Sequence, residues 1–154
     1  MQRRDFIKTL GAAAVIGAVV PAMSFAADAP KGPNAFSYKQ ALDTITGGKT
    51  PVKSEKIHLK VPEIAENGAV VPVTVEVDSP MTESDYVKAI YIFATKNNNV
   101  RCVAMHLTPA NGKAILGTRV KLGGTQDVAA LVEMSDGSFL VNSQSVKVTI
   151  GGCG

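Results

Sequence analysis

Residues 71–77, Val-Pro-Val-Thr-Val-Glu-Val, decide the fold, because a valine stands at every second position of this stretch. A period of two places the valines on one face of a β-strand and the proline, threonine and glutamate on the other. A strand that buries one face and exposes the other is typical of antiparallel sheets. We therefore expect an all-β domain built around this segment.

Similar segments precede and follow residues 71–77. The expected strands cover residues 56–61, 71–77, 86–96, 100–108, 114–122, 127–134, 139–142 and 145–150. Turn sequences rich in Gly, Asn and Asp, such as 66–68, 97–99 and 135–137, separate them at intervals of about eight to twelve residues. This pattern predicts an immunoglobulin-like antiparallel β-sandwich of two sheets.

The expected strand 86–96 is unusual because it is apolar on both faces, with Ile90 and Ile92 alternating with Tyr91 and Phe93. One face belongs in the core of the sandwich. The other can be covered by a short helix, which helical spacing of apolar residues predicts over residues 35–46. It can equally be covered by a second subunit, since a large exposed apolar patch usually marks an interface. The sequence leaves both possibilities open.

The N-terminus has the features of an export signal. Residues 3–8, Arg-Arg-Asp-Phe-Ile-Lys, match a twin-arginine signal. The apolar run 9–20 that follows is shorter than the roughly 18 residues that span a bilayer as a helix. Small residues at positions 24 and 26 (Ser24-Phe25-Ala26) favour cleavage after Ala26 rather than an uncleaved anchor. We therefore expect residues 1–26 to be a signal peptide that directs the folded protein to the periplasm.

After removal of the signal we expect three regions. These are a leader with the short helix at 27–55, the β-sandwich domain at 56–150, and a Gly-Gly-Cys-Gly swinging arm at 151–154. The whole chain has a formal net charge of +3, but the signal holds three basic and one acidic side chain, so 13 basic and 12 acidic side chains remain. Because this charge is balanced and forms no basic cluster, nothing supports nucleic-acid binding.

The last four residues, 151–154, carry the candidate chemistry. Glycine has no Cβ, so Gly151, Gly152 and Gly154 predict a flexible arm that reaches about 13 Å beyond the last strand. The thiolate of Cys153 would be a strong and unshielded nucleophile. The arm has no histidine, lysine or acidic side chain to activate that thiol, as a catalytic nucleophile requires. These features favour a covalent carrier, with Cys153 as the attachment site, over an enzyme.

The chain resembles the SoxY family, the sulfur-carrier subunits of the periplasmic thiosulfate-oxidising (Sox) system. Besides the paired arginines, the resemblance is carried by residues 62–68 (Pro-Glu-Ile-Ala-Glu-Asn-Gly), 71–73 (Val-Pro-Val), 77–81 (Val-Asp-Ser-Pro-Met), 133–139 (Glu-Met-Ser-Asp-Gly-Ser-Phe) and 148–154 (Val-Thr-Ile-Gly-Gly-Cys-Gly). Two features depart from the family pattern. The family tail usually ends Gly-Gly-Cys-Gly-Gly, whereas this chain ends at Gly154, and Cys102 is an additional cysteine.

The resemblance implies an immunoglobulin-like fold, a heterodimer with SoxZ and a reaction cycle on Cys153. In this cycle the cytochrome c SoxAX joins thiosulfate oxidatively to the cysteine sulfur. The manganese hydrolase SoxB then releases sulfate, and in some organisms the molybdenum dehydrogenase SoxCD oxidises the remaining sulfane sulfur. The metals belong to these partners, and we expect neither a cofactor nor a membrane span in this chain.

Cys102, His106 and the sandwich as a whole also allow other interpretations. Cys102 is either a small buried hydrophobic side chain or the disulfide partner of Cys153. A copper site shared by Cys102 and His106 is disfavoured, because two residues four positions apart on a strand are about 13 Å from each other. A structural sandwich subunit without covalent chemistry would have the same fold but would give Cys153 no role.

Overall fold

Strand β4 (Val71–Val77) forms as its alternation predicts, and its four valines are all buried. In the computed structural model, which describes residues 35–152, β4 is the middle strand of an antiparallel sheet with the order β2-β4-β7. Strand β2 covers Ile57–Lys60 and β7 covers Ala114–Val120. The backbone nitrogen of Pro72 cannot donate a hydrogen bond, and β2 ends opposite Thr74, before it reaches this proline.

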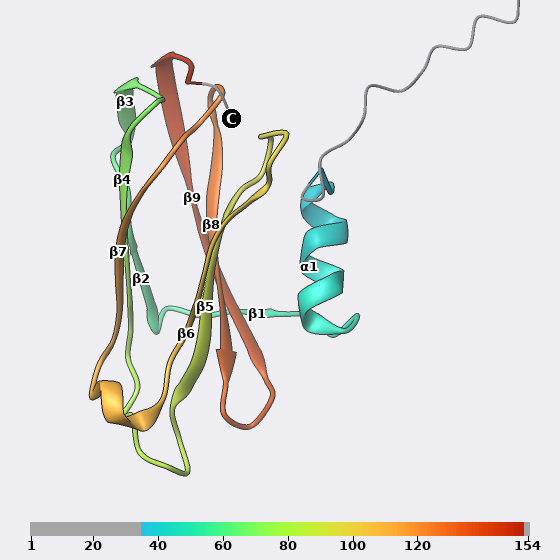
Figure 1. Ribbon diagram of the computed structural model, residues 1–154, viewed down its shortest axis with the longest axis vertical. Coiled ribbons are helices and arrows are strands. Elements are labelled where there is room, and N and C mark those ends of the chain that lie inside the picture. The colour runs from blue at the N-terminus through green and yellow to red at the C-terminus, as the bar shows by residue number, and fades with distance from the viewer. Residues whose placement is uncertain (1–34, 153–154) are drawn as a thin grey trace, which may run out of the picture.

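The second sheet is larger and has the strand order β1-β9-β8-β5-β6, with β3 also paired to β9. Its strands are β1 (Val52–Lys53), β3 (Ile64–Asn67), β5 (Val87–Ala94), β6 (Arg101–His106), β8 (Gln126–Met134) and β9 (Phe139–Ile150). A short 3-10 helix at Pro109–Asn111 connects β6 to β7. The two sheets face each other as the layers of a sandwich (Figure 1), so the predicted immunoglobulin-like fold is confirmed.

Strand β9 is one continuous strand, where two were expected, and two short strands that were not expected lie along it. Strands β1 and β3 both pair with β9 in parallel, at its beginning and its end. Between them the chain crosses to the other sheet as β2. Two side-chain amides of β9 hold this crossing in place. Asn142 Nδ2 donates to the Ile57 carbonyl at 2.8 Å, and Gln144 Nε2 donates to the Val61 carbonyl at 3.5 Å.

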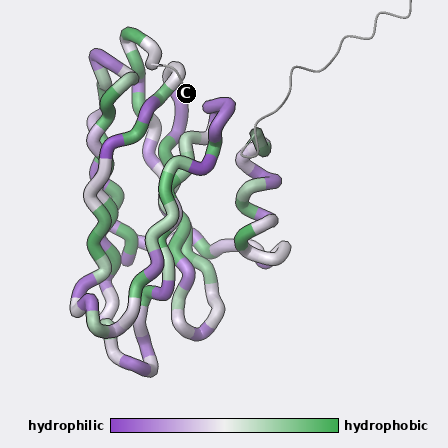
Figure 2. Tube along the Cα trace, viewed as in Figure 1, coloured by the Kyte–Doolittle hydropathy of each residue, from purple (hydrophilic) through white to green (hydrophobic). Residues whose placement is uncertain are grey.

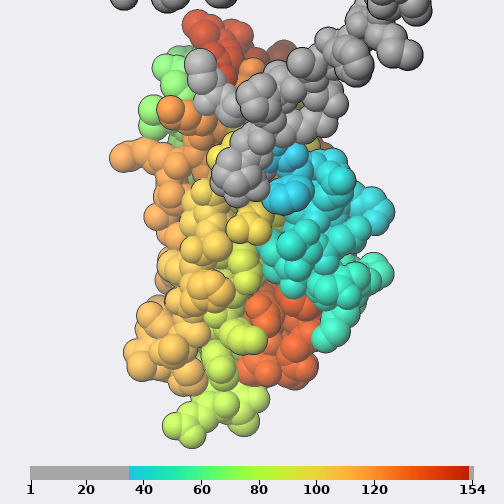
Figure 3. Space-filling view, turned by 45° about the vertical axis from the view of Figure 1, so that its right-hand side comes forward, coloured from blue at the N-terminus to red at the C-terminus, as the bar shows by residue number. Residues whose placement is uncertain are grey.

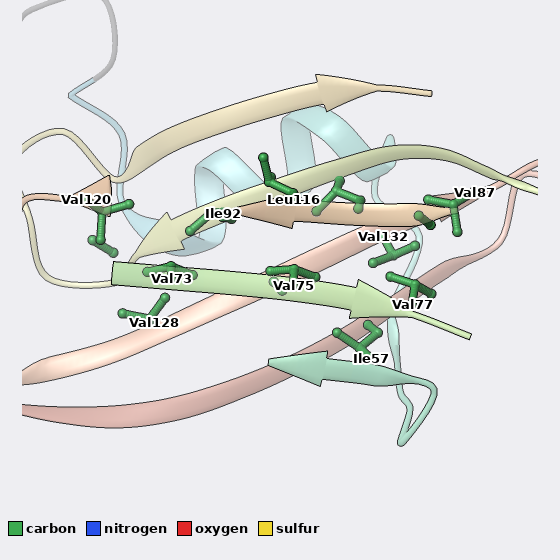
Figure 4. Close-up of a cluster of buried hydrophobic side chains, with 14 of the residues drawn as sticks. Ile57, Val73, Val75, Val77, Val87, Ile92, Leu116, Val120, Val128 and Val132 are labelled. Carbon is green, nitrogen blue, oxygen red and sulfur yellow. The ribbon is translucent and has the colours of Figure 1, made fainter. Parts of the chain in front are cut away.

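The main core lies between the two sheets, where the apolar faces of their strands meet. Its fully buried side chains include Ile57, Val73, Val75, Ile92, Val128 and Val132 (Figure 4). Hydrophobic residues gather along the strands, whereas hydrophilic residues are frequent in the loops at both ends of the sandwich (Figure 2). Burial of each such side chain stabilises the fold by about 1.5–3 kcal/mol.

A second hydrophobic cluster decides how the doubly apolar strand β5 is covered. Helix α1 (Tyr38–Thr46) lies against the flank of the sandwich (Figure 3). It packs onto the outer face of β5 and β8, where Tyr91, Phe93 and Leu131 are buried. The ring of Tyr38 meets Phe93 edge-on, with 5.5 Å between centroids. The helix therefore covers this face of β5, the first of the two possibilities that the sequence leaves open.

The ends of α1 follow standard capping chemistry. Ser37 Oγ accepts a hydrogen bond from the Gln40 N–H at 3.2 Å, and Gln40 Oε1 accepts one from the Ser37 N–H at 3.0 Å. This reciprocal pair satisfies two N–H groups that a helix start otherwise leaves without partners. Gly47 ends the helix in the left-handed region, at φ 63°. Within residues 35–152, no helix combines the length and the apolar character needed to cross a membrane.

Candidate functional site

The chain leaves β9 at Ile150 and passes between two loops at one end of the sandwich, residues 67–69 and residues 121–125 (Figure 1). We call these the tail-binding loops. The Gly68 N–H donates to the Ile150 carbonyl at 2.7 Å, and the Leu122 N–H donates to the Gly68 carbonyl at 2.7 Å. The Gly152 N–H then donates to the Leu122 carbonyl at 2.9 Å. Two of these backbone hydrogen bonds join the chain, at Ile150 and Gly152, to the two loops, and the third joins the loops to each other.

Three glycines make this close approach of backbones possible. A Cβ at position 68 would lie 2.2 Å from the Leu122 carbonyl oxygen, and one at position 151 would lie 2.4 Å from the Gly123 carbonyl oxygen. A Cβ at position 152 would lie 2.7 Å from the Ala69 Cα. Contacts this short with backbone atoms cannot be relieved by rotating a side chain. Only glycine therefore fits at these three positions.

The first half of the predicted arm, residues 151 and 152, lies against the tail-binding loops in this conformation. Gly152 is half-buried and hydrogen-bonded, and Gly151 packs against the backbone of Gly123. In this conformation the chain is held through Gly152. Gly151 and Gly152 thus permit close packing as well as conformational freedom, two properties that the sequence does not distinguish.

A buried amide pair holds the second tail-binding loop in place. Asn97 Nδ2 donates to the Lys121 carbonyl at 2.7 Å, and Asn97 Oδ1 accepts from the Gly123 N–H at 3.0 Å. Gln126 Nε2 donates to the same Asn97 oxygen at 2.8 Å. Both amides are at least nine-tenths buried. Leu122 lies between Lys121 and Gly123, the two residues that Asn97 anchors. The network therefore fixes the position of the Leu122 carbonyl, which accepts the hydrogen bond from the Gly152 N–H.

Gly68, Asn97 and Gln126 belong to this site, although the sequence predicts only turns at Gly68 and Asn97 and no role for Gln126. One signal was available for Gly68, because it ends the 62–68 segment that carries the family resemblance. For Asn97 the sequence holds no comparable signal, since asparagine is common in turns that bury nothing.

Of the predicted site residues, Cys153 and Gly154 lie outside the described residues, as does the whole predicted signal peptide. Cys102 lies on β6 and is half-buried against the main core. Its Sγ is 3.8 Å from the Val100 carbonyl oxygen, and burial raises the pKa of its thiol above the ordinary 9.0. A packed, protonated thiol is a poor nucleophile. The disulfide between Cys102 and Cys153 stays untested.

The copper alternative finds no geometric support. A register shift in the pairing of β5 and β6 leaves Cys102 as an extra residue, and its side chain packs against the main core. The ring of His106 instead meets Tyr91 edge-on, with 6.1 Å between centroids, on the helix-covered side of the sheet. The two side chains therefore face opposite sides of the sheet. Among residues 35–152, no three His, Cys, Asp or Glu side chains are grouped to bind a metal ion.

The fold and the site together define a class of protein, an immunoglobulin-like β-sandwich whose last strand leads into a glycine-cysteine tail held at its root by two loops. A family model described as "Sulfur oxidation protein SoxY" matches residues 42–153, which include both the sandwich and Cys153. The chain belongs to the SoxY family.

Solved structures agree with this assignment. The sulfur carrier protein SoxY from Chlorobium limicola f thiosulfatophilum is 31% identical, with a TM-score of 0.61, and the match covers 73% of this chain and 96% of that one. A superoxide reductase (neelaredoxin) from Ignicoccus hospitalis has a TM-score of 0.53 at 16% identity, covering 61% of this chain and 80% of that one. This second likeness shows the fold alone. A comparison with curated protein sequences found no match.

Proposed function

We propose that this chain is a sulfur carrier that holds intermediates of thiosulfate oxidation covalently on Cys153 and presents them to partner enzymes. The observation that carries the proposal is the course of the tail, because β9 and the two tail-binding loops bring the chain to one end of the sandwich directly before this cysteine. Membership of the SoxY family supports it. The 31% identical relative from Chlorobium limicola is itself described as a sulfur carrier protein.

The proposed chemistry begins with an oxidation at sulfur. The Cys153 thiolate and the sulfane sulfur of thiosulfate form an S–S bond, giving Cys-S-S-SO3⁻ and releasing two electrons. The family resemblance assigns these electrons to the haem of the cytochrome SoxAX. Water then cleaves the terminal S–S bond, giving sulfate, two protons and the persulfide Cys-S-S⁻. The first step needs a cysteine thiolate, which readily forms and breaks bonds to sulfur.

The thiol on the tail suits this role better than the second cysteine of the chain. Cys102 packs against the core, and burial raises its pKa, so it remains protonated at neutral pH. Cys153 lies between two glycines, which cannot shield its sulfur. In this proposal the chain is a substrate of its partners and not an enzyme, because the catalytic groups belong to SoxAX, SoxB and, where present, SoxCD.

The proposal includes the setting that the sequence predicts. Residues 1–26 would act as a twin-arginine signal peptide, residues 27–55 as a leader with α1, and residues 56–150 as the sandwich domain. The exported chain would work in the periplasm as a heterodimer with SoxZ. Export in the folded state fits such a pair, since a partner without its own signal can be carried along.

The test uses the mature chain with SoxZ, the three partner enzymes and thiosulfate, and follows cytochrome c reduction. We expect Cys153→Ser to abolish turnover and Cys102→Ser, the matched control, to retain it. Circular dichroism and co-purification with SoxZ should be unchanged in both variants. Normal turnover by Cys153→Ser would refute the carrier function and favour a structural subunit.

A further inference from the structure

The described part of the tail beyond β9, residues 151 and 152, is held by backbone contacts. Ile150 ends the strand, and the hydrogen bond found beyond it in these two residues joins the Gly152 N–H to the Leu122 carbonyl at 2.9 Å. Leu122 is fully buried while the tail is bound, but once the tail has left, water can replace this bond at little net cost. The tail can therefore detach from the tail-binding loops, and when it binds again it returns to the same geometry.

The two states give the tail two lengths. While Gly152 is bound, covalent geometry keeps the Cys153 Cα about 3.8 Å from a fixed point, the Gly152 Cα. When that bond opens, the fixed point moves back to Ile150, and three residues can extend the same Cα to about 10 Å from it. The reach of the thiol thus depends on a single hydrogen bond to a loop that Asn97 and Gln126 hold rigid.

We propose that the tail-binding loops form a clamp that sets the working length of the carrier arm, with Gly68, Gly151 and Gly152 as positioning residues. The closed clamp keeps Cys153 near the sandwich, and the open clamp lets it extend into the active site of a partner enzyme. This inference rests on the proposed function of Cys153. The clamp itself is a property of the free protein and can be tested without any sulfur chemistry.

The glycines provide variants that open the clamp without touching the cysteine. In Gly152→Ala the new Cβ would lie 2.7 Å from the Ala69 Cα, and in Gly151→Ala it would lie 2.4 Å from the Gly123 carbonyl oxygen. Both contacts are with backbone, so the tail must leave the loops. Gly124→Ala is the matched control, because a Cβ at that position of the same loop meets nothing within 4 Å.

The experiment uses the mature full-length chain in a Cys102→Ser background. One readout is hydrogen exchange of the amide at position 152. A second is the rate at which Cys153 reacts with a bulky maleimide, divided by its rate with the small reagent iodoacetamide. In Gly152→Ala and Gly151→Ala we expect amide exchange to rise about tenfold, as loss of one hydrogen bond implies. The bulky-to-small ratio should rise in parallel, and Gly124→Ala should match the parent in both readouts.

Two results would overturn the clamp. One is exchange of the parent Gly152 amide at the rate of an unprotected peptide. The other is an unchanged maleimide ratio in both opened variants. A general loss of structure cannot imitate the expected result, because the urea midpoint of each variant, measured in parallel, should stay at the parental value. Neither overturning result involves thiosulfate, so the clamp can fail while the carrier function stands, and a failed Cys153→Ser test leaves the clamp data unaffected.

Discussion

Replacing Asn97 with alanine tests whether the buried amide network organises the tail-binding end of the sandwich. The side chain makes three hydrogen bonds, to the Lys121 carbonyl, the Gly123 N–H and the Gln126 amide, at 2.7, 3.0 and 2.8 Å. Alanine removes all three, so the Lys121 carbonyl and the Gly123 N–H lose this partner, and Gln126 Nε2 keeps only its bond to the Gly124 carbonyl at 3.1 Å. The variant also leaves a small cavity where the amide was.

The expected cost follows from these contacts. An unsatisfied buried polar group costs about 1–3 kcal/mol. The Lys121 and Gly123 groups lie in a surface loop, where water can reach them, so their costs fall at the low end. Together with Gln126, which is only 2% exposed, we expect a loss of about 2–4 kcal/mol in the free energy of unfolding.

Urea unfolding followed by circular dichroism measures this loss as a midpoint lowered by about 1–2 M. Asn98→Ala is the matched control, since Asn98 is exposed in the same turn and should change the unfolding free energy by less than about 0.5 kcal/mol. If Asn97→Ala were as stable as Asn98→Ala, the network would not hold the loop. Faster hydrogen exchange at Gly152 should accompany the loss in Asn97→Ala.

Three further predictions concern the remaining parts of the fold. Ser37→Ala removes the N-cap of α1 and should destabilise the helix by about 1 kcal/mol, seen as faster amide exchange in Tyr38–Thr46 with the core strands unchanged. Phe93→Ala empties a fully buried site beneath α1 and should lower the unfolding free energy by about 3–5 kcal/mol; a loss below 1 kcal/mol would mean that the helix does not cover this face. Burial raises the pKa of folded Cys102 above 9.0, so the unfolded state ionises first and stability should fall as pH rises past 9.0. Cys102→Ala should remove that part of the decline in urea titrations, whereas an unchanged slope would show that the thiol is not buried.

The alternating strands could be predicted from sequence because their pattern is local. Strand β4 begins and ends where its valines predict, and β8 differs from the expected range by one residue at its start. The two residues of β1 carry too little periodicity to predict a strand, and the last residues of β3 fall in the segment 66–68, whose composition predicts a turn. They become strands only because β9 offers them a free edge.

Other features depend on contacts that the local sequence does not contain. Strand β9 was divided at residues 143–144 because polar side chains interrupt its pattern, yet Gln144 and Asn142 are polar in order to bind carbonyls at the crossing to β2. The cover of β5 stayed open because helix and strand are far apart in sequence. The glycines of the tail suggested freedom, and their close packing appears only when Gly68 and Leu122 are placed beside them.

Peptide mapping by mass spectrometry tests whether Cys153 carries the sulfur. The mature chain, with SoxZ, would be incubated with thiosulfate and the cytochrome SoxAX, with the hydrolase omitted so that the first adduct accumulates. We expect one added thiosulfate group, located on the peptide that contains Cys153 and removed by a thiol reductant. An adduct on Cys102 instead, or full electron transfer with Cys153 unmodified, would contradict it.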